Sequence, residues 1–160
     1  MRVSEKGRGK LSKVKRKDLL MSLLFEKGTN EEKEPLDRIR IMKGLFLLSQ
    51  EAPRLAKLFN FEPYLYGAID FDVYTELESL EKEGLAKTTN ESSNDRWDRY
   101  LLTNRGISEA QRVEKRIPNT VRDEVARIKR YVTSKQTYEL LKEIYAKYPS
   151  FAKKSVIRFR

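Results

Sequence analysis

The order of the apolar patterns along the chain limits the fold more than any other feature of this sequence. Three stretches with apolar residues at helical spacing come first, and two short strand-like runs, residues 85–89 and 97–103, follow them. The segment between the two runs, residues 90–95, consists of Asn, Asp, Glu and Ser, which favour a turn. Three helices followed by a β-hairpin is the order of a winged helix-turn-helix domain, in which the hairpin is the wing. We therefore predict a mainly α fold with a small β-hairpin.

The ends of the three helices are marked in the sequence. We expect the first helix to start near Asp18 and stop at Gly28, and the second to start at Pro35, which suits a first helical turn. The third helix is predicted to run from the capping residue Asp70 to Gly84. Its inward positions are Phe71, Val73, Tyr74, Leu77 and Leu80.

Further segments surround this unit. We expect a short helix over residues 53–59 and an extended aromatic loop that ends at Gly67. After the hairpin, one helix starts at Asn104 or Ser108 and ends at Arg116, and a helical region from residue 120 breaks within 133–135 and ends near residue 148. The winged helix-turn-helix thus has a helical C-terminal extension. The predicted divisions are a flexible basic arm (1–17), a winged-helix domain (18–106), C-terminal helices packed on it (107–150) and a basic tail (151–160).

The absence of cysteine and histidine argues against most catalytic chemistry. It excludes disulfides, thiolate nucleophiles, nearly all structural zinc sites and the usual general base. The sequence also has no Gly-rich phosphate loop and no Gly-x-Ser-x-Gly motif. We expect no enzymatic activity, no cofactor and no metal. Because there is no apolar run of 18 residues and no apolar stretch after the basic start, we expect a cytoplasmic protein without a membrane partner.

The formal net charge of +10 is concentrated at the two ends of the chain. Residues 1–17 carry a balance of +7, residues 147–160 carry +5, and the remainder carries −2. A basic arm that binds DNA or RNA releases counterions, so its affinity depends steeply on salt. The alternative is a solvated, disordered tail. The candidate nucleic-acid-binding residues of the arm are Arg2, Lys6, Arg8, Lys10, Lys13, Lys15, Arg16 and Lys17.

The predicted wing and the late basic helix are further candidates for nucleic-acid binding. The wing carries Lys87, Arg96, Trp97 and Arg99, and an arginine-bearing wing can follow phosphates or enter a minor groove. In the alternative interpretation, Trp97 covers the core and the two arginines pair with neighbouring aspartates. On the late helix, the candidates are Arg127 and Arg130, accompanied by Arg122, Lys129 and Lys135; they are equally typical of an exposed helix in a charge-rich protein.

The third helix, which enters the major groove in many winged-helix proteins, is acidic here. Five of its eight outward residues are Asp or Glu, and carboxylates near phosphate are repelled. We therefore do not expect conventional groove insertion. The alternative function is docking of a protein partner through Asp72, Glu76, Glu78 and Glu81. Tyr64, Tyr66 and Tyr74 are interpreted as core and loop anchors rather than as a binding site.

Several separated stretches resemble a family of small prokaryotic proteins of the YwgA type, related more distantly to the Panacea, or phage-associated antitoxin-like, domain. The matching stretches are residues 40–48, residues 64–67, Val73-Tyr74 with Leu77, Leu80 and Gly84-Leu85, and Tyr145 with Tyr148-Pro149 and Lys154-Ser155. One departure is Ala68, which stands where the family usually has proline after the glycine. The resemblance implies the winged-helix fold far more than a function, because the family is largely uncharacterised.

A second likeness lies in residues 100–106, which look like the second wing strand and the following turn of many winged-helix transcription regulators. Thr103 is placed to cap the next helix. We therefore expect a non-catalytic nucleic-acid-binding protein, with DNA favoured over RNA, that acts as a regulator or accessory subunit. The alternative is an antitoxin-like or defence-system module that binds a protein partner. A homodimer is the default expectation for such a regulator.

Overall fold

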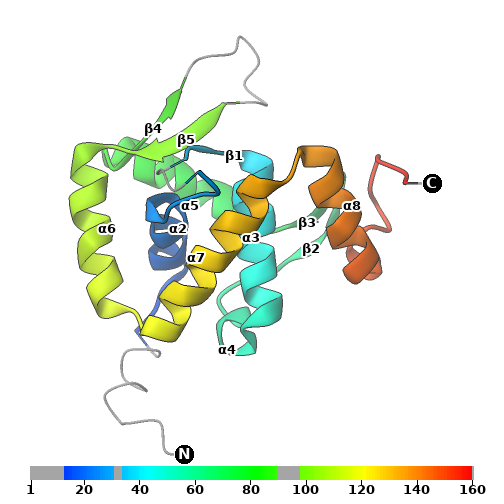
Figure 1. The fold of residues 1–160 in the computed structure, drawn as a ribbon, viewed down its shortest axis with the longest axis horizontal. Helices are drawn as coiled ribbons and strands as arrows, with labels where there is room; N and C mark the ends of the chain where they lie inside the picture. The colour runs from blue at the N-terminus through cyan, green and yellow to red at the C-terminus, as the bar shows by residue number, and fades with distance from the viewer. Residues whose placement is uncertain (1–12, 31–33, 90–97, 160) are drawn as a thin grey trace, which may run out of the picture.

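The computed structural model describes residues 13–30, 34–89 and 98–159 (Figure 1). This part of the chain is mainly helical and contains two small antiparallel sheets. The elements in chain order are α2 (Arg16–Phe25), β1 (Leu36–Asp37), α3 (Arg38–Glu51), α4 (Pro53–Ala56), β2 (Glu62–Tyr64), β3 (Gly67–Ile69), α5 (Phe71–Lys82), β4 (Ala86–Thr89), β5 (Arg99–Leu102), α6 (Asn104–Arg116), α7 (Asn119–Ser134), α8 (Thr137–Lys147) and the 3₁₀ turn η2 (Pro149–Phe151).

The predicted hairpin is confirmed as β4 and β5, which pair antiparallel after α5. The sheet also has a third strand that was not predicted: β1 pairs antiparallel with β5, so the strand order is β1-β5-β4. Leu36 lies opposite Tyr100, and both side chains are buried. Pro35 therefore precedes a strand, and the prediction that it opens the second helix is wrong. Asp37 begins α3 instead, because its Oδ1 accepts a hydrogen bond from the Arg40 amide at 2.8 Å.

Helix α5 has the predicted ends and most of the predicted inward face. The Asp70 carboxylate accepts a hydrogen bond from the Asp72 amide at 3.0 Å, and Gly84 follows the helix with a φ of 76°. Val73, Leu77 and Leu80 are buried. Phe71 is the exception, since its side chain is 48% exposed.

The expected aromatic loop is a second hairpin, inserted between α4 and α5. Strands β2 and β3 pair antiparallel, with Tyr64 opposite Gly67. Gly67 has a φ of 91°, a conformation that favours glycine. The chain end covers part of this hairpin, because the Val156 amide donates to the Leu65 carbonyl at 2.8 Å.

The first helix begins before the predicted boundary at Asp18. Helix α2 starts at Arg16, and Val14 in front of it is already buried. The Lys15 amide donates to the Asp18 carboxylate at 3.1 Å, so Asp18 stabilises the first turn from inside the helix. Residues 14–17 consequently belong to the folded domain rather than to the predicted arm.

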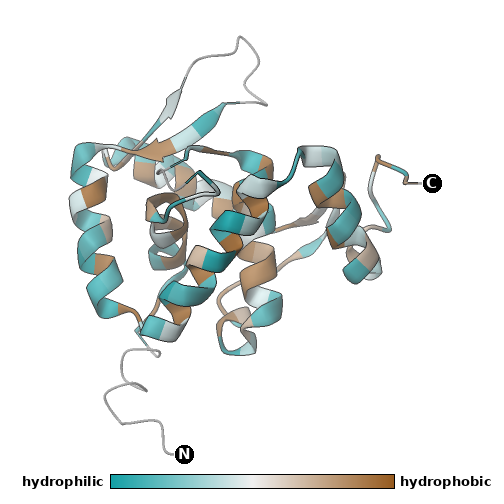
Figure 2. Cartoon of the chain, viewed as in Figure 1, coloured by the Kyte–Doolittle hydropathy of each residue, from teal (hydrophilic) through white to brown (hydrophobic). Residues whose placement is uncertain are grey.

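The apolar residues gather in the middle of the molecule. Figure 2 shows brown segments on α2 and α3 at the centre and teal outward faces on α6 and α7. Every residue of α3 from Ile41 to Ser49 is buried, while α7 contributes Val121, Val125, Ile128 and Val132 to the same core. The predicted cap of α6 is confirmed, since the Gly106 amide donates to Thr103 Oγ1 at 3.0 Å, and the predicted break separates α7 from α8.

Candidate functional site

The described part of the β4–β5 hairpin, the predicted wing, presents two candidate basic residues on one face. Lys87 lies on β4 opposite Leu101, and Arg99 lies on β5 opposite Thr89. Because side chains alternate along a strand, this register puts Lys87 and Arg99 on the outward face, and both are exposed. Arg96 and Trp97 lie outside the described residues.

Two residues of the predicted basic arm form ion pairs with α5, the helix that the sequence predicts as the acidic third helix. Arg16 lies 3.2 Å from Glu76 and 3.7 Å from Asp72, measured from guanidinium nitrogen to carboxylate oxygen. The ammonium group of Lys17 lies 2.9 Å from the carboxylate of Glu83. Helix α2 therefore neutralises part of the acidic charge of α5. The predicted arm therefore has fewer unpaired cations, and the predicted partner surface fewer unpaired carboxylates, than the sequence indicates.

The other arm residues divide at the edge of the described structure. Lys13 and Lys15 are exposed just before α2. Arg2, Lys6, Arg8 and Lys10 lie outside the described residues. On α5, Glu78 and Glu81 remain exposed and point away from the core. The pKa of the nearby Arg38 is raised chiefly by its hydrogen bond to the Tyr100 hydroxyl, and charge attraction from Glu81 adds a smaller contribution.

The late basic helix, α7, is mostly committed to contacts within the protein. Arg127 forms ion pairs with Glu51 and Glu124. Arg130 is exposed. Lys129, which the sequence places on the same basic face, is fully buried at 0% exposure. Only Arg130 of these three therefore presents an uncommitted charge to solvent among the described residues.

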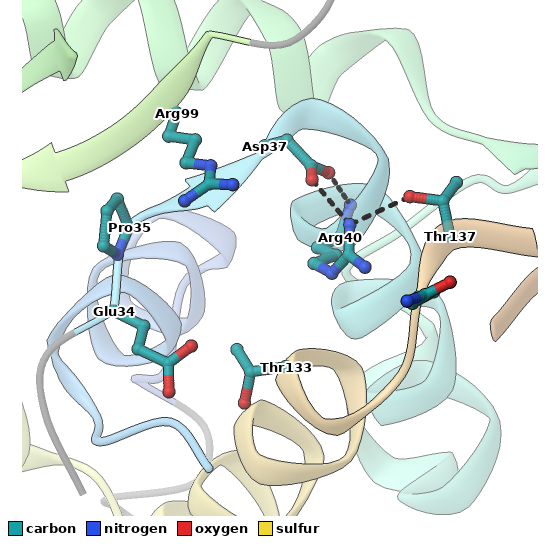
Figure 3. A pocket seen from close by; sticks show the side chains of 8 residues that line it. Glu34, Pro35, Asp37, Arg40, Arg99, Thr133 and Thr137 are labelled. Atoms are coloured by element: carbon teal, nitrogen blue, oxygen red, sulfur yellow. Dashed lines mark hydrogen bonds and ion pairs between the residues drawn. The ribbon is translucent and has the colours of Figure 1, made fainter. Parts of the chain in front are cut away.

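A polar pocket of about 340 Å³ lies where the β1-β5-β4 sheet meets the junction of α7 and α8 (Figure 3). Arg99 extends into it from β5, with Glu34, Thr133 and Gln136 on the other walls. The half-buried Arg40 donates there to Asp37, to Thr137 and to the carbonyls of Val132 and Lys135. Because four of its five N–H groups are used within the protein, Arg40 joins α3 to the junction of α7 and α8 and offers little to a ligand.

A smaller pocket, of about 190 Å³, lies between α3, the β2–β3 hairpin and the start of α5. Lys43 lies on its inner wall, and the aromatic residues Tyr64, Tyr66, Phe71 and Tyr74 line it. The rings of Tyr64 and Phe71 meet edge to face at 5.2 Å, and Tyr64 is 40% exposed. The interpretation of the three tyrosines as core and loop anchors stays a prediction, but Tyr64 is more exposed than a core residue.

Lys43 is the buried charge-bearing group of this pocket. Its side chain is 3% exposed, and its Nζ donates to the carbonyl of Ala68 at 2.8 Å. Burial lowers the pKa of Lys43 to about 7. The amine is thus close to half-protonated at neutral pH.

The sequence contains a local signal for Lys43 that the distribution of net charge does not show. The residue stands alone in an apolar run, with Ile41 and Met42 before it and Leu45 and Phe46 after Gly44. A single lysine inside a helix that is apolar all round must be buried, and buried lysines are rare unless they are paired or functional.

Comparison of the sequence with protein-family models and with curated proteins gives no match. Within the described ranges, no helix is long and apolar enough to cross a membrane. In the same part of the chain, no group of three or more acidic side chains is arranged to hold a metal ion.

Proposed function

We propose that this protein is a winged-helix protein that binds nucleic acid, DNA in preference to RNA, without catalysing a reaction. A regulator or an accessory subunit in a DNA-related process fits this role. The observation that carries the proposal is the position of β1. It lies between α2 and α3 and pairs with β5. The order is therefore helix, strand, helix, then α4 and the β2–β3 hairpin as an insertion, then α5 and the two-stranded β4–β5 hairpin, which would be the wing. The resemblance to YwgA-like proteins supports the same fold.

The proposed binding surface lies at the periphery of the domain. Lys87 and Arg99 share the outward face of the wing, and the N-terminal residues 1–12 add four basic side chains against a single acidic one, Glu5. Helix α5 would repel phosphate through its exposed carboxylates, because they carry the same sign of charge. Contact through the wing and the N-terminal residues avoids this repulsion.

Fluorescence anisotropy with a labelled DNA duplex over a range of salt concentrations tests the proposal. The double variant Lys87→Glu with Arg99→Glu should bind about tenfold more weakly or worse, and its plot of log affinity against log salt should be shallower by about 2. Replacing Arg2, Lys6, Arg8 and Lys10 with serine should reduce the same slope by about 3 to 4. An RNA duplex of the same sequence should bind more weakly than the DNA.

The control carries the same charge change elsewhere. Lys142 on α8 and Lys153 are exposed and lie away from the wing, so Lys142→Glu with Lys153→Glu should reduce affinity less than the wing variant does. Equal losses in the two double variants would show only a response to total charge, and the wing would then have no specific role.

The alternative, a protein-interaction module, rests on the exposed carboxylates Glu78 and Glu81 of α5. Reversal of both charges to lysine should leave DNA affinity unchanged or raise it under the main proposal. If the alternative is correct, the same variant loses a basic protein partner that co-purifies with the wild type, while the wing and N-terminal variants keep it.

A further inference from the structure

The pocket around Lys43 has the size of a site for one small ring. Its volume is about 190 Å³. Cavities of about 150 Å³ lined by apolar side chains hold benzene, so a single six-membered ring with one substituent fits here. The walls come from three elements: Ile39 and Met42 of α3, the β2–β3 hairpin, and Phe71 and Tyr74 of α5.

The walls are apolar and aromatic, which favours a flat apolar ligand. Rings of Tyr64, Tyr66, Phe71 and Tyr74 contribute faces and edges for contact with another ring. Tyr64, Leu65 and Phe71 are exposed at the rim, where burial by a ligand removes apolar surface from water.

The inner wall supplies one polar group with unused hydrogen-bonding capacity. A lysine ammonium group has three N–H donors, and Lys43 donates one of them, to the Ala68 carbonyl. Within the described part of the chain, no carboxylate pairs with it, and burial alone accounts for its lowered pKa. A buried cation without an anionic partner is unfavourable, so an incoming anion at this position would be strongly favoured.

We propose that this pocket binds a small aromatic carboxylate of one ring. The ring lies among the aromatic walls, and its carboxylate accepts hydrogen bonds from Lys43 at the inner end. This site is separate from the proposed nucleic-acid surface and does not depend on it.

Direct binding of 4-fluorobenzoate to the full-length protein, followed by ¹⁹F NMR, tests the proposal. We expect saturable binding at pH 6.5, with the Lys43→Met variant at least about tenfold weaker, as for loss of a charge-assisted hydrogen bond. The matched control is Lys142→Met, which removes an exposed lysine on α8 and should bind as the wild type does. The absence of saturable binding below about 10 mM, or equal affinity in the Lys43 variant, would overturn the proposal.

A second measurement needs no variant and therefore does not depend on its folding. The neutral analogue 4-fluorotoluene has the same ring without the carboxylate, and the wild type should bind it at least about tenfold more weakly than 4-fluorobenzoate. If the two bind equally well, the pocket is only an apolar hollow, and the role of Lys43 is disproved.

The pH dependence of binding identifies the ammonium group. The carboxylate binds the protonated form of Lys43, whose pKa in the free protein is about 7, so affinity should be nearly constant between about pH 5 and 6, where the ligand is ionised and the lysine is protonated. Above pH 7 it should fall by about tenfold per pH unit. Other groups that face this region are Tyr64 and Tyr66, Tyr74 with Arg38 over its ring, and Tyr145 behind Gly67. Burial raises the pKa of Tyr74 and of Tyr145, so neither ionises below pH 9. A pH-independent affinity between pH 6 and 9 would contradict the assigned role of Lys43.

Discussion

Lys43 on α3 and Lys129 on α7 are both buried lysines, but their surroundings differ. Lys129 Nζ donates to two carbonyls, those of Leu23 at 2.7 Å and Leu24 at 3.1 Å. These carbonyls lie in the last turn of α2, where helical carbonyl groups lack partners within the helix. Lys43 donates to one carbonyl and lies on the wall of a pocket.

The difference shows why one buried amine stabilises the fold while the other stays available to a ligand. Lys129 completes the C-terminal end of α2 and joins it to α7, at the negative end of the helix dipole. Burial lowers the pKa of both lysines to about 7, but Glu34 and Glu26 oppose that effect at Lys129. Among the described residues, no carboxylate opposes it at Lys43. The number of acceptors around each amine therefore separates a group that holds the fold from one that can receive a ligand.

Removal of each amine gives the largest expected contrast. Lys129→Met should be less stable than Lys43→Met by about 2 kcal/mol, because it leaves two buried carbonyls without a donor, whereas water entering the pocket can hydrate the single carbonyl freed in Lys43→Met. Both variants also lose the unfavourable burial of an amine whose pKa falls on folding, so Lys43→Met should be at least as stable as the wild type at pH 7. Urea unfolding at pH 7 measures both values. Equal stability of the two variants would remove the distinction between the two lysines.

The pH dependence of stability gives the next largest effect. A lysine with a folded-state pKa of about 7 and an ordinary value of 10.5 when unfolded binds fewer protons in the native state between those values. Stability should therefore rise with pH above 7, by about 1.4 kcal/mol per pH unit for each lysine. Lys43→Met should remove its share of this rise in urea unfolding between pH 7 and 8.5. If the stability of Lys43→Met rises with pH as steeply as that of the wild type, the amine of Lys43 is more hydrated in the folded protein than the structure indicates.

The range above pH 7 isolates the lysines from Glu114. Burial and a hydrogen bond with Glu26 raise the pKa of Glu114 to about 7 from 4.5. A raised carboxyl pKa contributes stability that is present below 4.5 and is lost as pH rises through 7. Between pH 4.5 and 7, Glu114 should therefore make the free energy of unfolding decrease as pH rises. Above pH 7, the lysines should make it increase as pH rises.

Two glycines with positive φ test the packing beside Lys43. A Cβ on Gly67 would lie 2.8 Å from Tyr145 Cε1 and 3.5 Å from Lys43 Nζ, whereas a Cβ on Gly84 would meet its nearest neighbour at 3.6 Å. Both Gly→Ala variants introduce backbone strain, but Gly67→Ala should be less stable than Gly84→Ala by about 1 kcal/mol. Thermal unfolding of the two variants measures the difference. If Gly84→Ala is the less stable one, the region behind the pocket is looser than the structure indicates.

The smallest expected difference is the order of the two lysine pKa values. Because carboxylates act on Lys129 and none in the described ranges acts on Lys43, Lys129 should keep its proton to the higher pH of the two. The ¹³Cε chemical shifts of labelled lysines give both titrations, with the Met variants for assignment. The reverse order would show that hydration of the amine dominates at Lys43.

The sequence predicted the elements that have a local signal. Asp70, Gly84 and Thr103 mark helix ends by residue type alone, and the structure has all three where they were expected. Strand β1 was missed because two residues, Leu36 and Asp37, are too few to show an alternating pattern. Its existence depends on pairing with β5, which lies about 60 residues further along the chain.

The candidate site was less predictable, because charge pairing and pocket walls depend on tertiary contacts. Nothing near Arg16 in the sequence identifies Glu76 as its partner. The sequence context predicts that Tyr64 is a core or loop anchor and that Phe71 faces inward on its helix. Both side chains are exposed because the second hairpin lies at the start of α5. Lys43 alone had a local signal, the surrounding apolar run.

The ion pairs between α2 and α5 make the carboxylates of α5 an internal competitor for any polyanion. Arg16 and Lys17 are already bound to Asp72, Glu76 and Glu83, in positions where phosphates would otherwise pair with them. A nucleic acid that reached α2 would have to displace the protein's own anions rather than release small ions to solvent. The salt slope of binding should accordingly reflect fewer cations than the basic N-terminal sequence contains.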